Sequence, residues 1–213
     1  MPTKTSTTKR LESMLTRAEA AIKRSAWFEA ERITLKAIEA AREVDEFELM
    51  SRICVPLKEA RRQRMLQAME ISTKVQILEH VEPEPTADPG IFMIRPPGVA
   101  ADARRLRIAA LHEETPLIIV TREPTTRLGL APIAAVGRIT VRVRIEEPKN
   151  PEKPSVSWVM GALEQLGDGA IDSLDPDADP ANKVDSLLAF LDSVPDHQRL
   201  HDVLAENCKL AAG

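Results

Sequence analysis

Apolar residues recur in the first third of the chain at the spacing of α-helices. The first stripe consists of Leu11, Met14, Leu15, Ala18 and Ile22, at offsets of three, four, seven and eleven residues from its first member. Such offsets place side chains on one face of a helix. A second stripe begins at Trp27 and a third near Glu46, and Ser25 lies between the first two. We predict a helical region over residues 1–72, with a break between its first two helices at Ser25.

The period of the pattern changes after this region. Val75, Ile77 and Val81 alternate with polar residues, which indicates a strand. The predicted strands cover 74–81, 91–94, 116–121, 131–136 and 138–146, and a stripe from Val99 through Ala103 and Leu106 to Ala110 predicts one helix. The last two strands form a hairpin that turns at Val136 and Gly137. Residues 73–147 are therefore predicted to form a β-β-α-β-β-β sheet module.

Helical periodicity returns in the last part of the chain. Three prolines among charged residues mark 148–154 as a linker, and helical stripes resume over 155–213. The predicted fold class is α+β and helix-rich. In this prediction, N-terminal and C-terminal antiparallel helical hairpins flank the sheet module.

Both helical regions carry residues at the spacings of a known repeat. In the first region these are Trp27, Ala30 and Ala37 of the second helix and Ala18 and Ala21 of the first. In the last region they are Leu163, Leu166, Gly167 and Ala170. The pattern resembles the helical hairpin of tetratricopeptide repeats. That resemblance implies a non-catalytic interaction or scaffold protein whose partner is another protein or a second copy of itself.

Charge is distributed unevenly along the chain, although the net charge is only −4. Residues 91–145 carry nine arginines, no lysine and four acidic residues, whereas residues 146–213 carry five basic and 14 acidic residues. Guanidinium groups match the geometry of phosphate, so a phosphate or nucleic-acid surface is one interpretation. The module contains a single aromatic residue, Phe92, and therefore lacks a stacking platform for bases. Pairing of the arginines within the chain or with a partner protein is the favoured interpretation.

The candidate site residues are all arginines. Those predicted to face a protein partner are Arg61, Arg62, Arg64, Arg142 and Arg144. Those of the alternative anion site are Arg95, Arg104, Arg105 and Arg107. The segment from Arg95 to Gly98 joins a strand to a helix, but its two prolines remove the N–H groups that a phosphate loop would use. We expect a rigid turn there.

Metal, cofactor and catalytic signals are weak. His197, His201 and Cys208 fall on one predicted helix. At 1.5 Å per residue, Cys208 lies too far along that helix to share an ion with both histidines, so we expect buried packing histidines. The acidic loop between Asp168 and Asp179 lacks the central glycine and the final glutamate of a calcium loop. We predict no metal and no cofactor. The sequence does not decide whether the chain is an enzyme, but it favours a protein without catalysis.

Compartment signals point to the cytoplasm. The first residues include no apolar stretch typical of a secretory signal, and no run approaches 18 apolar residues. Cys54 and Cys208 lie far apart on apolar helical faces, where a free thiol behaves as a small hydrophobic group. We therefore expect a cytoplasmic protein without membrane contact.

Overall fold

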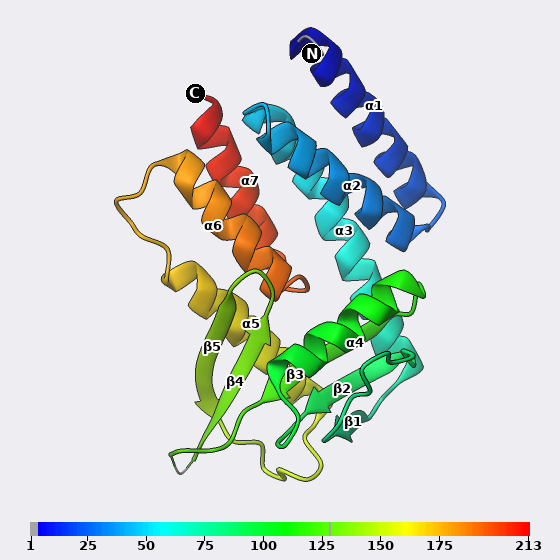
Figure 1. The fold of residues 1–213 in the computed structure, drawn as a ribbon, viewed down its shortest axis with the longest axis vertical. Helices are drawn as coiled ribbons and strands as arrows, with labels where there is room; N and C mark the ends of the chain where they lie inside the picture. The colour runs from blue at the N-terminus through cyan, green and yellow to red at the C-terminus, as the bar shows by residue number, and fades with distance from the viewer. Residues whose placement is uncertain (1–3, 128) are drawn as a thin grey trace. The chain divides into compact units, whose positions relative to one another are not determined.

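The computed structural model describes residues 4–127 and 129–213 (Figure 1). The helices are α1 (Lys4–Lys23), α2 (Trp27–Arg42), α3 (Phe47–Ile71), α4 (Ala100–His112), α5 (Val156–Asp172), α6 (Pro180–Ser193) and α7 (Gln198–Ala212). The strands are β1 (Val75–Leu78), β2 (Gly90–Ile94), β3 (Leu117–Arg122), β4 (Leu130–Val136) and β5 (Thr140–Glu146). The predicted helix-rich α+β class is confirmed, and so is the β-β-α-β-β-β order.

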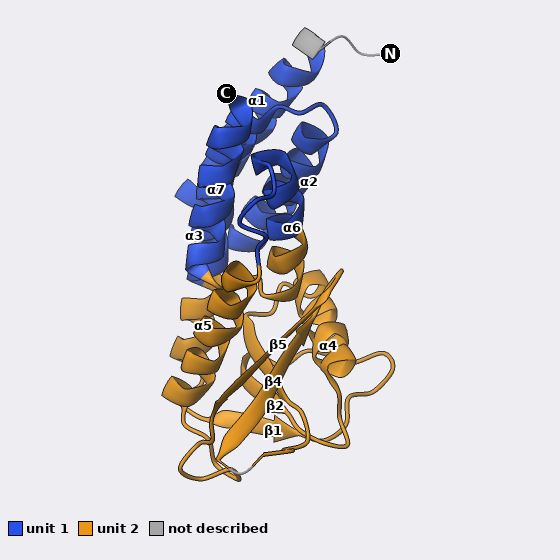
Figure 2. Cartoon of the chain, turned by 90° about the vertical axis from the view of Figure 1, so that its left-hand side faces the viewer, with its two compact units in different colours: residues 1–63, 174–188, 198–213 blue, residues 64–173, 189–197 orange. Residues whose placement is uncertain are grey.

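The chain folds into two compact units (Figure 2). Unit 1 contains residues 1–63, 174–188 and 198–213, and unit 2 contains residues 64–173 and 189–197. Both units are thus assembled from segments that are distant in sequence. The predicted linker, 148–154, lies inside unit 2. The regions 1–72, 73–147 and 155–213 stay a prediction of domain boundaries.

Small residues let the first helices of unit 1 approach closely. Ala21 of α1, Ala30 of α2 and Ala60 of α3 are fully buried and form one cluster. The chain reverses between α1 and α2 around Ser25, whose φ of 60° is left-handed. That reversal confirms the predicted break. The alanines on which the tetratricopeptide resemblance rests therefore have a packing role, while the family itself stays a prediction.

The sheet of unit 2 is mixed, with its strands in the order β1-β2-β3-β4-β5. The first three strands are parallel to one another, and β4 and β5 are antiparallel to their neighbours. All residues of β2 are buried, as expected of a strand covered on both faces. Helix α4 packs on the face that carries Leu117 and Ile119. Helix α5 packs on the other face (Figure 2), and Gly169 of this helix lies against Val143 of β5.

The hairpin of β4 and β5 follows the predicted pattern. Val136 pairs with Thr140, and the Gly137 N–H donates to the Ile139 carbonyl, so the turn lies where it was expected. Val141 and Ile145 are buried, and the residues between them are more exposed. The helix before the hairpin differs from its prediction in one respect. Val99 was expected to point inward, but it precedes α4 and is 55% exposed, and Ala100 is buried instead.

None of the helices in the described residues is both long enough and apolar enough to cross a membrane.

Candidate functional site

The four arginines of the alternative anion site all contact acceptor groups within unit 2. Arg95 Nε lies 2.9 Å from Glu79 Oε1, and its Nη1 lies 2.5 Å from Glu152 Oε2. The hydrogen bonds to Glu152 and then to Glu79 raise the pKa of Arg95. A guanidinium that is already paired with two carboxylates attracts a phosphate only weakly.

Helix α4 positions the other three arginines. Arg105 donates to the Val81 carbonyl at 3.1 Å and to the carboxylate of Asp102, one turn earlier on the helix. Arg104 Nη2 lies 3.7 Å from Asp192 Oδ2, which is ion-pair distance. Both side chains are partly solvated, so each pair contributes little to stability.

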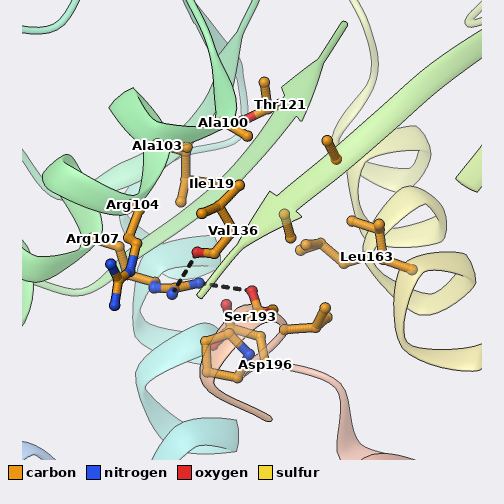
Figure 3. A pocket seen from close by; sticks show the side chains of 15 residues that line it. Ala100, Ala103, Arg104, Arg107, Ile119, Thr121, Val136, Leu163, Ser193 and Asp196 are labelled. Atoms are coloured by element: carbon orange, nitrogen blue, oxygen red, sulfur yellow. Dashed lines mark hydrogen bonds between the residues drawn. The ribbon is translucent and has the colours of Figure 1, made fainter. Parts of the chain in front are cut away.

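Arg107 binds the end of a helix (Figure 3). Its guanidinium donates to the carbonyl of Asp192 at 2.6 Å and to that of Ser193 at 2.9 Å, and these are the last two residues of α6. A third carbonyl, that of Val136 in β4, lies 3.4 Å away. The C-terminal carbonyls of a helix have no partner within it and carry partial negative charge. Arg107 is therefore a structural cap that connects α4, the β4–β5 hairpin and the end of α6.

A small cavity lies beside this cap (Figure 3). Apolar side chains of the sheet and of α5, including Ile119, Val136 and Leu163, line it together with Arg104 and Arg107. Its volume is about 20 Å³, enough for one water molecule. Sites for small-molecule ligands typically have about 300–1,000 Å³. The cavity is therefore not a substrate pocket.

Arg142 and Arg144 lie on the exposed row of β5, as predicted. Arg142 Nε lies 3.0 Å from Glu123 Oε1. Within the part of the chain that the structure describes, Arg144 has no ion pair. β5 is the last strand of the sheet, so one side of its backbone has no neighbouring strand among the described residues.

A larger hollow opens beside Arg144. It has a volume of about 320 Å³, within the range of ligand-binding sites. Its walls come from the start of α4, the segment after β3, and the paired residues Pro132 and Arg144 of β4 and β5. The lining residues are Gly98, Val99, Glu123, Pro124, Thr126, Pro132 and Arg144. The hollow thus combines exposed apolar surface with one guanidinium and one carboxylate.

The N-terminal arginines are placed differently from the prediction. Arg61 is 5% exposed, and its Nε lies 2.9 Å from Glu31 Oε1, which is also buried. Arg64 is 6% exposed. Only Arg62 is on the surface, where it pairs with Glu59. Burial of Arg61 and Arg64 speaks against the surface role predicted for them. Helical spacing alone did not reveal that the carboxylate of Glu31 is buried and pairs with Arg61.

Both candidate histidines are buried, as expected for packing residues. His197 precedes α7 instead of lying on it, and its Nε2 lies 3.2 Å from Glu164 and 3.6 Å from Asp168. His201, on α7, contacts Arg61 in unit 1 at 3.3 Å. Because a guanidinium has only donors, the Nε2 of His201 must accept this hydrogen bond.

The acidic loop has local structural roles. Asp179 Oδ1 accepts the Asn182 N–H in the first turn of α6, and Asp175 Oδ1 accepts the Asp177 N–H. Among the described residues, no group of three or more His, Cys, Asp or Glu side chains is arranged to hold a metal ion.

The partners of the central arginines come from more of the chain than the charge pattern indicated. The acidic C-terminal part supplies Glu152, Glu147 and Asp192. The module itself supplies further acids, among them Glu79 and Glu123.

Compared with known proteins, the chain matches no protein-family model, no curated protein and no solved structure.

Proposed function

We propose that this chain is a non-catalytic, cytoplasmic interaction protein that binds another protein, or a second copy of itself, through β5 and the adjoining hollow. The observation that carries the proposal is Arg144. It lines a hollow of about 320 Å³ on an edge strand and forms no ion pair among the described residues.

The chemistry of this surface favours an extended acidic segment as the bound element. An edge strand offers backbone N–H and C=O groups to an added strand. Arg144 can form charge-assisted hydrogen bonds with a carboxylate, and Val99, Pro124 and Pro132 provide apolar contact beside it. The resemblance of the α1 and α2 sequences to tetratricopeptide hairpins also favours a scaffold, because such hairpins commonly present binding surfaces.

The phosphate or nucleic-acid alternative has less support. Arg95, Arg104 and Arg105 are close to carboxylates, and Arg107 is bound to helix carbonyls. A polyanion would have to displace these groups before it could bind.

Affinity capture from native extract with matched variants tests the proposal. The wild-type chain, Arg142→Glu/Arg144→Glu and Arg138→Glu/Arg127→Glu serve as baits, and mass spectrometry identifies what each retains. Both variants change the charge of the sheet unit by the same amount. We expect partners that the wild type and the second variant retain and the β5 variant loses.

Self-association requires its own measurement, since a second copy would be invisible among the captured proteins. Sedimentation equilibrium of the wild type across concentrations gives the mass of the assembly. If the wild type is monomeric and captures nothing that the β5 variant loses, the proposed function is wrong.

A further inference from the structure

The two cysteines of the chain, 154 positions apart, come together in unit 1. Cys54 lies on α3 and Cys208 on α7. Both thiols are free, and the two residues are 2% and 0% exposed, respectively. The sequence offered no motif that would pair them.

Two contacts between the same helices fix how these cysteines face one another. Lys58 Nζ of α3 lies 2.7 Å from Asp202 Oδ2 of α7, and Arg61 Nη1 lies 3.3 Å from His201 Nε2. Position numbers rise along α3 as they fall along α7, so the helices are antiparallel. Cys54 lies seven residues before Arg61, and Cys208 seven residues after His201. A seven-residue step returns to the same side of a helix, which places the cysteines on the shared seam.

The two thiols lie close enough on this seam to shift each other's pKa. Interaction with the thiol of Cys208 raises the pKa of Cys54 well above its ordinary value, and burial adds to this effect. The same interaction lowers the pKa of Cys208. Burial opposes this decrease, and the positive charge of Arg42 adds to it. Cys208 is therefore the sulfur better suited to be a nucleophile, because the thiolate is the reactive form.

We propose that Cys54 and Cys208 form a redox-active dithiol, which a low-molecular-weight disulfide such as oxidised glutathione converts to an intramolecular disulfide between α3 and α7. The Cys208 thiolate attacks one sulfur of the oxidant, forms a mixed disulfide and releases one thiolate. Cys54 then gives up its proton, attacks the Cys208 sulfur and displaces the second thiolate. Overall, two cysteine thiols are oxidised, and one molecule of oxidant is reduced to two thiols.

Access to Cys208 depends on opening of the last turn of α7. The helix ends at Ala212, and Leu210, two residues after Cys208, is 67% exposed. Helix ends open locally at much lower free-energy cost than the global fold. The oxidation is thus expected in the folded chain, at a rate set by this opening.

Mass spectrometry of the full-length chain tests the proposal. The folded protein is incubated with oxidised glutathione, and remaining thiols are then alkylated under denaturing conditions. We expect a species that is lighter than the reduced chain by ~2 Da, takes up no alkylating agent and yields one linked peptide pair containing Cys54 and Cys208 after non-reducing digestion. Its urea unfolding midpoint should exceed that of the reduced chain, and reductant should reverse the increase.

The single variants Cys54→Ala and Cys208→Ala serve as controls, after circular dichroism has verified their helix content. We expect Cys54→Ala to stop at the glutathione mixed disulfide, and Cys208→Ala to react at least tenfold more slowly. A wild-type chain that keeps the mixed disulfide, forms only intermolecular links or cross-links only in urea would overturn the proposal.

Discussion

Gly167 lies in α5 directly against the ring of His197. A Cβ at this position would lie 2.0 Å from the ring carbon Cγ, and the ring is buried. We expect Gly167→Ala to destabilise the protein by about 1–3 kcal/mol, because the packed ring must move to make room. Urea unfolding followed by circular dichroism measures the change.

Gly161 in the same helix provides the matched control. A Cβ there meets nothing within 4 Å. Gly161→Ala should therefore stabilise the protein by about 0.5–1 kcal/mol, since alanine has less conformational freedom to lose in a helix. Equal effects of the two substitutions would show that His197 does not pack as described.

Arg61 and Glu31 form a buried ion pair, and substitution of Arg61 tests how much this pair contributes to stability. Both side chains are buried, so Arg61→Ala removes a charge partner of Glu31 at a site away from water. The expected loss is about 3–5 kcal/mol. The double variant Arg61→Met/Glu31→Leu should lose much less, because it removes both charges.

Arg62 tests whether the effect comes from burial. It is adjacent in sequence and pairs with Glu59 on the surface. Arg62→Ala should leave the urea midpoint within error of the wild type. A loss in Arg62→Ala as large as in Arg61→Ala would contradict the assignment.

The sequence indicated which single residues carry charges that need a partner, but not which groups surround them in the fold. It predicted that Arg61 faces a protein partner, and it assigned Arg107 to the alternative anion site. The structure places one against the buried Glu31 and the other against helix carbonyls. In both cases the acceptor lies at least 30 positions away along the chain, and no local pattern encodes such a distance.

At the scale of elements, Arg107 connects α4 to the end of α6 and to the β4–β5 hairpin. Arg107→Met removes hydrogen bonds from a charged donor to the carbonyls of Asp192 and Ser193. We expect a loss of about 1.5–3 kcal/mol, and a partial loss for Arg107→Lys, whose single ammonium cannot span both carbonyls. Hydrogen exchange of residues 189–197 should become faster in both variants.

Arg138 in the β4–β5 turn provides the control substitution for Arg107. Its side chain is exposed and forms no hydrogen bond with the end of α6 among the described residues, so Arg138→Met removes the same charge from the same unit and leaves the Arg107 cap in place. Exchange over 189–197 should stay at the wild-type rate in Arg138→Met. If residues 189–197 exchange equally fast in Arg107→Met and Arg138→Met, the faster exchange results from the loss of positive charge and not from the loss of the cap.

Most elements could be predicted from the sequence, because periodicity reports local burial. The strand order β-β-α-β-β-β and the turn at Gly137 follow from such patterns. What periodicity could not show is which helix joins which unit. Helix α5 packs on the sheet, while α7 belongs to unit 1, although both lie in the predicted C-terminal region. Assembly of this kind depends on contacts between distant segments.

At the scale of the whole molecule, ion pairs with nearby glutamates neutralise much of the positive charge of the central arginines. Arg95, Arg122 and Arg142 each pair with one or more glutamates of unit 2. The charge pattern correctly indicated internal pairing, but it did not reveal that acids within the module share that role. The module's formal positive charge is therefore a poor guide to its attraction for polyanions.

Retention on heparin measures this neutralisation. We expect the wild type to elute at low salt, and Glu79→Gln/Glu152→Gln to elute later, because Arg95 loses both of its carboxylate partners. Binding through released guanidinium groups should weaken steeply with salt, since each phosphate-like contact releases counterions. Glu84→Gln/Asp88→Asn alters the net charge equally at exposed acids of the same unit that do not pair with Arg95. Coelution of the two double variants would mean that net charge alone governs retention. A wild type that already binds with a steep salt dependence would instead favour the phosphate alternative, because its arginines would then be available despite their carboxylate partners.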